Sequence, residues 1–271
     1  TLRKLAQKGT LVMVPTHSSN MDSILLGWSL DHAGLPPVTY GAGKNLFVNP
    51  LTGFFMHNLG AYKVDRRITH GLYKSILKTY SQVLIERGFH SLFFPGGTRS
   101  RSNEIESKLK LGLLGTALSA FTLSNQQEKN QPIYVCPVTI NYNLVLEAES
   151  LIHEHLRREG GGRYFLENDE FNQISTIIRF VMNTVRMDST TIIRYGAPMD
   201  VFGNLVEADG ESYDSQGRRI DPVDFVRSVR TGEVIEDTGR DREYTRHTGA
   251  CIHEAFRQNT VLLSSSVVAY A

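Results

Sequence analysis

The 271-residue sequence has little cysteine, no excess of either charge and no long hydrophobic run. Two cysteines, Cys136 and Cys251, are too few for a disulfide framework, so we expect a reducing, cytoplasmic environment. Lys and Arg total 29 and Asp and Glu total 28, and this balance excludes a bulk attraction to nucleic acid or to an anionic membrane. The apolar runs are shorter than the ~18 residues that a membrane span needs. What remains is a globular protein.

The two ends of the sequence read as cuts in a longer chain. It begins at Thr1 without a methionine and stops inside an apolar run at 267–271. We therefore expect a single domain over residues 1–271 that is a fragment of a longer protein. A polar, glycine-containing stretch at about 203–240 predicts an exposed insertion around one short helix.

Short apolar runs alternate with segments of helical periodicity through the first 160 residues. This alternation predicts an α/β fold with a mostly parallel central sheet flanked by helices on both faces. The helix at 70–86 is clearly amphipathic, with Leu72, Ile76 and Tyr80 on one side. The expected strands cover 11–16, 38–41, 61–64, 91–94, 133–140 and 191–195, and the expected helices cover 20–31, 51–59, 70–86, 111–123, 174–185 and 242–257.

The first candidate site is the segment 16–22, where a buried strand is expected to turn into a helix. His17 alone among the nine histidines has an aspartate, Asp22, five positions later. An aspartate one helical turn away can bond the second ring nitrogen, which fixes the tautomer and stabilises the imidazolium after it takes a proton. The alternative is a polar turn in which His17 is a bystander and Asp22, with the Ser-Ser-Asn sequence at 18–20, caps the helix.

The second candidate site, at 93–101, also follows an expected strand. Gly96 and Gly97 allow a tight turn, and their amides can point inward as an anion nest. Arg99 and Arg101 lie two residues apart and can flank a phosphate with charge-assisted hydrogen bonds. The alternative is a surface loop with solvated arginines.

Two further segments carry weaker signals. The segment 60–67 is the end of a strand followed by the adjacent Arg66 and Arg67, which alone indicates a solvated charge pair. The segment 135–142 is a buried strand that contains a proline, and alone it indicates only a core position.

Motifs of several other function classes are missing. The glycines at 41–43 before Lys44 complete neither a P-loop nor a dinucleotide fingerprint. The nucleophile elbow of α/β-hydrolases does not occur. His153 and His155 lack the spacing of a zinc protease, and we expect them on an exposed helix. The residues therefore indicate no metal, no redox cofactor and no nucleic-acid partner.

Taken together and in order, the four segments resemble the blocks of the glycerolipid acyltransferase superfamily. Within it, the sequences Arg-Ser-Arg at 99–101, Lys-Leu-Gly-Leu-Leu at 110–114 and Val-Thr-Ile-Asn-Tyr at 138–142 resemble the glycerol-3-phosphate and dihydroxyacetone-phosphate acyltransferase branch. The resemblance covers residues 5–145 well. The H-x4-D, G-x5-R, F-P-E-G-T-R-S and V-P-hydrophobic blocks start here at His17, Gly60, Phe94 and Val135.

The resemblance implies transfer of a fatty acyl group from a thioester to a hydroxyl of glycerol 3-phosphate in phospholipid biosynthesis. The donor is acyl-CoA or an acyl-carrier protein as co-substrate, and lysophosphatidate and dihydroxyacetone phosphate are alternative acceptors. His17 would act as the general base and Asp22 would support it, with no metal or cofactor. The residues implied in binding the substrates are Lys44, Arg66, Gly96, Gly97, Thr98, Arg99, Ser100 and Arg101.

The sequence departs from the family pattern at two positions. Gly96 stands where the family has glutamate, and Cys136 stands inside the fourth block. The glutamate is usually assigned to substrate positioning or to bonding within the site. Its replacement raises an alternative of another class, a catalytically weak relative that binds lipid or acyl carrier.

A lipid-like product implies contact with a membrane surface, so we expect a cytoplasmic protein that associates peripherally with the membrane. Phe47, Phe54, Phe55 and Met56 are candidates for a membrane-facing or acyl-lining patch. The alternative for each of them is packing in the core.

Overall fold

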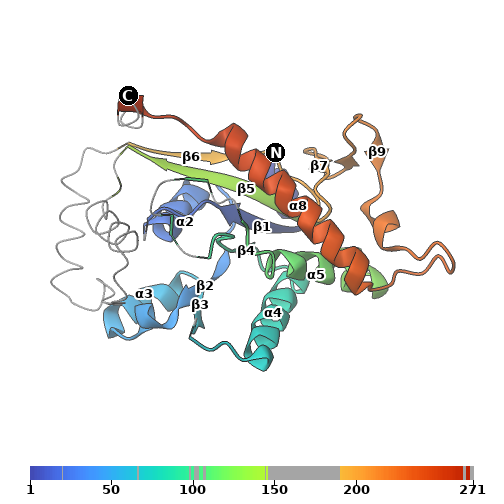
Figure 1. The fold of residues 1–271 in the computed structure, drawn as a ribbon, viewed down its shortest axis with the longest axis horizontal. Helices are drawn as coiled ribbons and strands as arrows, with labels where there is room; N and C mark the ends of the chain where they lie inside the picture. The colour runs from blue at the N-terminus through green and yellow to red at the C-terminus, as the bar shows by residue number, and fades with distance from the viewer. Residues whose placement is uncertain are drawn as a thin grey trace.

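The computed structural model, shown in Figure 1, describes most of the chain. The predicted helix at 174–185, together with His153 and His155, lies outside the described residues. For Leu51 and Thr52 the backbone alone is described. The described residues are 1–19, 21–65, 67–97, 99–100, 104–105, 108–143, 145, 190–264 and 267–268.

A six-stranded sheet forms the centre of the molecule, in the order β3-β2-β4-β1-β5-β6. Neighbouring strands are parallel except β6, which runs antiparallel to β5. The predicted α/β fold with a mostly parallel sheet is confirmed. The strands are β1 (Thr10–Pro15), β2 (Thr39–Gly43), β3 (Ala61–Val64), β4 (Ser91–Leu92), β5 (Ile133–Tyr142) and β6 (Thr191–Tyr195).

Both faces of the sheet are covered, which is why β1 reads as a continuous apolar run. Every residue of β1 is buried, and successive side chains point to opposite faces. Leu11 and Met13 join one core cluster, and Val12 and Val14 join the other.

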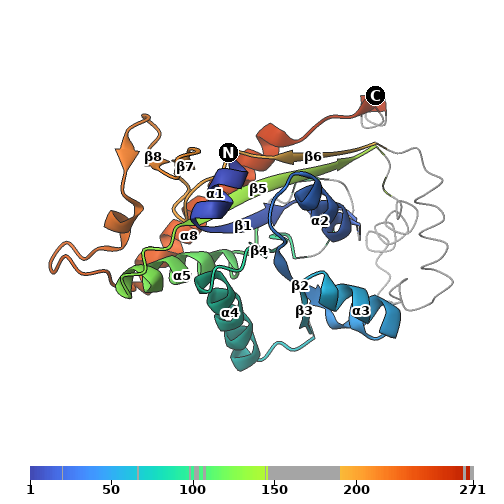
Figure 2. The same cartoon turned by 180° about the vertical axis from the view of Figure 1, so that it is seen from behind.

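The helices divide between the two clusters. Helices α1 (Leu2–Lys8), α2 (Asp22–His32) and α3 (Pro50–Asn58) lie on the face seen in Figure 2, where Leu5, Leu26, Leu30 and the half-buried Met56 join Leu11. Helices α4 (Gly71–Glu86), α5 (Leu114–Gln126) and α8 (Thr238–Asn259) cover the other face, where Ile85, Leu118, Phe121, Ile252 and Phe256 join Val12. A 3-10 helix, η1 (Lys44–Phe47), connects β2 to α3.

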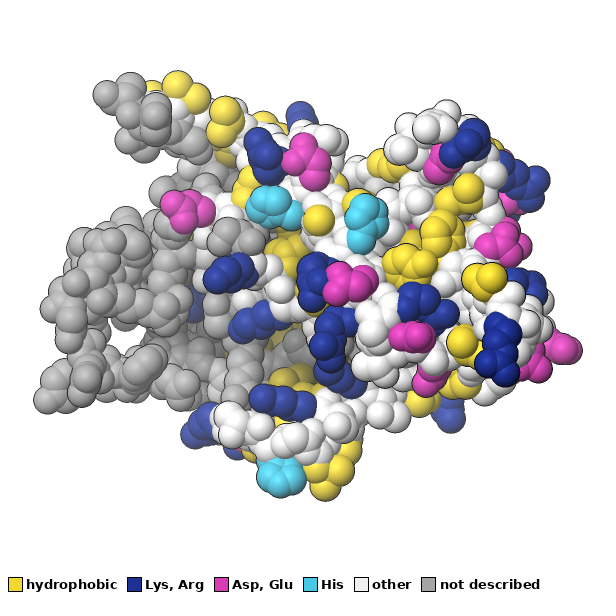
Figure 3. Space-filling model, turned by 45° about the vertical axis from the view of Figure 1, so that its right-hand side comes forward, with side chains coloured by type: hydrophobic (Ala, Val, Ile, Leu, Met, Phe, Trp, Pro, Cys, Tyr) yellow, Lys and Arg dark blue, Asp and Glu magenta, His cyan; other side chains and the backbone are white. Residues whose placement is uncertain are grey.

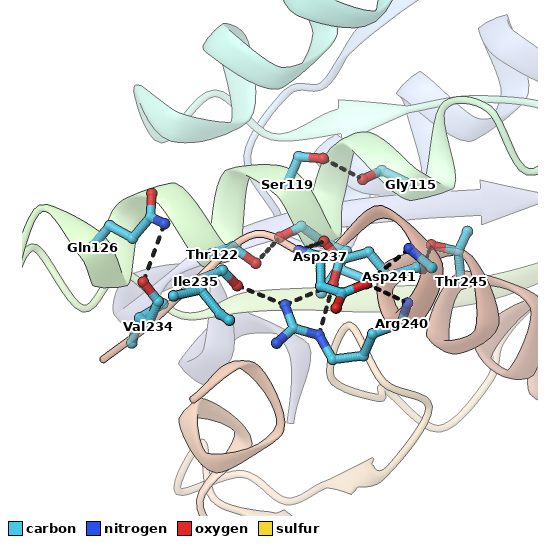
Figure 4. A network of polar contacts seen from close by, with 12 residues as sticks. Gly115, Ser119, Thr122, Gln126, Val234, Ile235, Asp237, Arg240, Asp241 and Thr245 are labelled. Atoms are coloured by element: carbon cyan, nitrogen blue, oxygen red, sulfur yellow. Dashed lines mark hydrogen bonds and ion pairs between the residues drawn. The ribbon is translucent and has the colours of Figure 1, made fainter. Parts of the chain in front are cut away.

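The start of α8 lies four residues before the predicted position. The carboxylate of Asp237 accepts the amides of Gly239 and Arg240, each at 2.9 Å, so that the helix is capped there. Arg240 then bonds Asp241 and, through Nη2, the carbonyl oxygen of Ile235 at 2.6 Å, as Figure 4 shows. These hydrogen bonds stabilise the first turn of α8 and the segment that leads into it.

The polar stretch before α8 contains more structure than the one predicted short helix. A small antiparallel sheet comprises β7 (Leu205–Val206), β8 (Ser212–Tyr213) and β9 (Arg219–Ile220), and the 3-10 helix η3 (Pro222–Val226) follows. Strands of two residues are too short to give an alternating pattern in the sequence.

Candidate active site

The candidate site lies at the carboxyl ends of three adjacent strands. β1 pairs with β4 on one side and β5 on the other. The loop after β1 carries His17, the loop after β4 carries the segment 94–100, and β5 ends at Tyr142. Parallel strands present their carboxyl ends at one edge of the sheet, and this edge is where α/β proteins place ligand sites.

His17 and Asp22 form a hydrogen-bonded pair. The Nδ1 atom of His17 lies 2.8 Å from Oδ2 of Asp22. An ionised carboxylate only accepts hydrogen bonds, so Nδ1 carries the proton, and Nε2 of the neutral ring is left with its lone pair. The Asp22 side chain is completely buried, and that of His17 is 14% exposed. The predicted pairing is confirmed, with the histidine on the solvent side.

Backbone amides hold the Asp22 carboxylate in place. Ser18 and Ser19 donate their N–H groups to the same Oδ2 atom at 2.7 Å and 2.9 Å. Helix α2 begins at Asp22 itself, and the N-cap position, Met21, makes no side-chain cap hydrogen bond. Helix α2 thus begins two residues after the predicted start. Of the predicted Ser-Ser-Asn cap, the Ser19 hydroxyl accepts the amide of Met21 at 3.1 Å, and Asn20 lies outside the described residues.

Tyr142 completes the set of groups around Asp22. Its hydroxyl donates to Oδ1 of Asp22 at 2.5 Å. Asp22 thus accepts hydrogen bonds from the imidazole, two amides and a phenol. Charge-assisted bonds of this kind are what a fully buried carboxylate requires.

The loop after β4 covers one side of His17. The Phe94 ring stacks on the imidazole with centroids 4.0 Å apart and planes inclined by 24°. The amide of Ser100 donates to the carbonyl oxygen of His17 at 2.7 Å. The structure therefore brings the first and second candidate sites together.

Gly97 closes a tight turn in this loop. Its amide donates to the carbonyl oxygen of Phe94 at 3.0 Å, and its φ of +73° favours glycine. Of the two amides predicted to form an anion nest, that of Gly97 is therefore engaged within the turn, while Gly96 remains a candidate. The side chain of Lys110 lies where a Gly97 Cβ would be, and the Lys110 amide donates to the carbonyl oxygen of Pro95 at 2.7 Å.

The predicted phosphate-binding residues differ in what the structure says of them. Arg99 is half-buried and makes polar contact. Within the described residues, its Nη1 atom is buried and has no hydrogen-bond acceptor of its own. Arg66 and Arg101, the other two arginines predicted to bind phosphate, lie outside the described residues, as does Thr98, predicted to bind substrate.

Lys44 is bound to a different carboxylate. Its ammonium forms an ion pair with Asp65, just after β3, and Arg67 lies 3.7 Å from the same carboxylate. The hydrogen bond from Lys44 holds the pKa of the Asp65 carboxyl below its usual range. The phosphate-binding role predicted for Lys44 therefore stays a prediction, and phosphate would have to compete with Asp65.

Two side chains of the candidate site, Tyr142 and Lys110, had no role predicted from the sequence. Both lie in the segments that carried the family resemblance, so a signal existed. Tyr142 is the last residue of β5, the strand beside β1. Lys110 is distant from Gly97 in the sequence, and the fold brings its side chain against Gly97.

The four candidate patch residues divide between the two interpretations. Phe47 and Met56 are half-buried and pack against the core, whereas Phe54 and Phe55 are 64% and 53% exposed. Cys136 is fully buried in β5, and burial raises the pKa of its thiol to about 12.

Within the described residues, no group of three or more His, Cys, Asp or Glu side chains is placed to hold a metal ion.

A search of the described helices found none with both the length and the apolar character needed to cross a membrane.

The family model and three curated relatives that match this chain are all acyltransferases. The family model described as "Acyltransferase" matches residues 1–141. The glycerol-3-phosphate acyltransferase of Haemophilus ducreyi is 29% identical over 97% of this chain, that of Aeromonas hydrophila 31% over 76%, and that of Actinobacillus succinogenes 34% over 84%. The chain spans 30%, 24% and 26% of the lengths of these relatives.

The solved structures that match include the 1-acyl-sn-glycerophosphate acyltransferase of Thermotoga maritima. It is 18% identical, with a TM-score of 0.35, and the match covers 52% of this chain and 48% of the other.

Proposed function

This chain belongs to the acyltransferase family, and we propose that it transfers a fatty acyl group from an acyl thioester to a hydroxyl of glycerol 3-phosphate. The observation that carries the proposal is the His17–Asp22 pair, with Nδ1 held at 2.8 Å. In the described part of the chain no hydrogen bond engages Nε2, so this atom is available to a substrate. The names of the glycerol-3-phosphate acyltransferase relatives support the choice of acceptor.

The pair supports general-base catalysis without a covalent enzyme intermediate. Nε2 of His17 takes the proton of the acceptor hydroxyl while the hydroxyl oxygen attacks the thioester carbonyl carbon. The C–O bond of the ester forms, the C–S bond breaks, and the leaving thiolate takes the proton back from the imidazolium. Asp22 stabilises that imidazolium and keeps the ring oriented.

The acceptor's phosphate is assigned to the cations of the loop after β4. Arg99 lies one residue before Ser100, whose amide is bonded to His17. We assign the phosphate to Arg99, with Arg66 and Arg101 as further ligands, as the family resemblance implies. Lys110, which lies over Gly97, adds a cation at the same turn. The Gly96 amide is the candidate donor to the thioester oxyanion.

The donor and the membrane contact are finer parts of the same proposal. Acyl-CoA and an acyl-carrier-protein thioester are both compatible with the mechanism, since the carbonyl and sulfur are common to them. The acyl chain and the product are lipids, so we propose a peripheral membrane contact on the cytoplasmic side. Lysophosphatidate and dihydroxyacetone phosphate remain alternative acceptors.

The deciding experiment measures thiol release from a long-chain acyl-CoA with each of the three acceptors in the presence of vesicles. We expect glycerol 3-phosphate to give the highest kcat/KM. His17→Ala should lower kcat by about 10²- to 10⁴-fold. His32→Ala is the matched control, because His32 lies at the far end of α2 and should leave the rate unchanged.

Gly96 motivates the second candidate function, a lipid- or acyl-binding relative without turnover. Saturable acyl binding with no thiol release would favour it, provided that acyl-carrier-protein thioester and the Gly96→Glu variant are also silent. Acceptor-dependent release that disappears in His17→Ala would exclude it.

A further inference from the structure

Residues 44–80 hold a concentration of positive charge. This stretch contains six Lys and Arg residues and a single acidic residue, Asp65, so its net charge is +5 in a chain whose total is +1. Asp65 is itself engaged by Lys44 and Arg67, and its side chain is only 14% exposed. This stretch is therefore basic, although the whole chain carries a net charge of only +1.

The same stretch exposes large apolar side chains. Six of them lie on α3, on the turn that follows it, and on the connection from β3 into the first half of α4. We name this set the β3-edge patch, since α3 and α4 flank the edge strand β3. Each member is between 42% and 64% exposed: Phe54, Phe55, Leu59, Ile68, Leu72 and Ile76.

The apolar side of α4 points away from the core. The buried residues of this helix are Ser81 and Ile85, each nine residues after Leu72 or Ile76. Nine residues are two and a half turns, so Leu72 and Ile76 face the opposite direction. An amphipathic helix ordinarily turns its apolar face to the core, and here the described core lies on the other side.

The patch is continuous in space with basic side chains. Figures 1 and 2 both show α3, the β3–α4 connection and the start of α4 along the same lower side of the molecule. In Figure 3 hydrophobic and basic side chains lie together at this lower end, with no acidic side chain among them. Lys63 is exposed, and its ammonium lies 5.3 Å from the centre of the Phe47 ring, next to α3.

We infer that the β3-edge patch is the surface through which this protein docks on an anionic phospholipid bilayer. Exposed apolar side chains insert at the level of the headgroups, and neighbouring Lys and Arg side chains are attracted to acidic lipids. Charge and exposed apolar side chains together favour this occupant, because acidic headgroups over a hydrocarbon layer complement a net charge of +5 beside six exposed apolar side chains. This docking surface rests on the proposed function, because an enzyme with lipid substrates and products works at a membrane. Binding of the protein to vesicles does not itself require turnover.

The test is cosedimentation of the protein with vesicles. Equimolar phosphatidylglycerol and phosphatidylcholine should bind it, phosphatidylcholine alone should bind it much less, and added salt should weaken binding. The double variant Leu72→Ser/Ile76→Ser should lower the affinity for anionic vesicles by roughly tenfold or more, because two apolar side chains are lost.

A matched control is the double variant Leu205→Ser/Val229→Ser. These residues are 55% and 107% exposed and lie in the insertion around β7 and η3, away from the patch. Its vesicle affinity should equal that of the wild type. Equal losses in the two double variants, or equal binding to both kinds of vesicle, would overturn the proposal.

Two more measurements separate this inference from the proposed function. Turnover of a water-soluble short-chain acyl-CoA should be unchanged in Leu72→Ser/Ile76→Ser, and His17→Ala should bind vesicles like the wild type. If the protein does not bind vesicles but forms dimers that the patch variant dissociates, the patch is an interface between copies and the docking proposal fails. That result would leave the His17 mechanism untouched.

Discussion

Replacing Tyr142 with phenylalanine removes one oxygen atom and one hydrogen bond to the buried Asp22 carboxylate. The bond is 2.5 Å long, and hydrogen bonds to charged groups are worth about 1.5–3 kcal/mol. Oδ2 of Asp22 keeps its three donors, so the pair with His17 should survive with a carboxylate that is less well held. If the full loss is felt in the transition state, kcat falls by about 10- to 150-fold.

The assay is steady-state acyl transfer, read as separate kcat and KM values, with urea unfolding of the same samples. KM for the acceptor should stay near the wild-type value, since we assign Tyr142 no substrate contact. Tyr195→Phe is the control: its hydroxyl lies 3.0 Å from the neutral Ser29 hydroxyl, and kcat should not change. A Tyr142→Phe enzyme with wild-type kcat, or one that loses no more than Tyr195→Phe, would refute the positioning role.

Three further outcomes follow from the structure. Gly97→Ala should lower the free energy of unfolding, measured with urea, by about 1–2 kcal/mol. Gly217→Ala should lower it less, because both glycines have positive φ but only Gly97 is covered by Lys110. Burial raises the pKa of the Asp200 carboxyl above 3.8, so the folded state binds the carboxyl proton more tightly than the unfolded state does. The free energy of unfolding of the wild type, relative to that of Asp200→Asn, should therefore decline as the pH rises from 3.8 through the raised pKa. A difference between the two proteins that stays constant with pH would contradict this. Cys136, with its buried thiol and a pKa of about 12, should resist alkylation at pH 8 until the protein is unfolded, as mass spectrometry of labelled protein would show.

Local features of the sequence were sufficient for much of the fold. The run at 11–16 was recognisable as a buried strand. The five-residue spacing of His17 and Asp22 predicted a contact that forms at 2.8 Å. Both inferences depend on residues that are close in sequence, where the geometry of a strand or a helical turn fixes what can meet.

Contacts between distant segments could not be predicted in the same way. The hydroxyl of Tyr142 reaches Asp22 across 120 residues because β5 pairs with β1, and the sequence does not state that register. The amphipathic pattern of α4 was visible, but the pattern gives no direction, and the packing of Ser81 and Ile85 turned its apolar side outward. Lys44 was predicted as a phosphate ligand, and its partner Asp65 is set by the fold.

The hydrogen bonds around Asp22 bear on the choice between an enzyme and a binding relative. A buried ion pair is weak evidence for stability, because apolar residues of similar size often stabilise a core as well or better. A buried carboxylate that orients an imidazole, with two amides and a phenol in support, is therefore better explained by proton transfer than by folding. Gly96 contributes to none of these hydrogen bonds. Gly96 in place of the family's glutamate therefore leaves the His17–Asp22 pair intact, and any effect should fall on substrate binding or on the oxyanion contact proposed for the Gly96 amide.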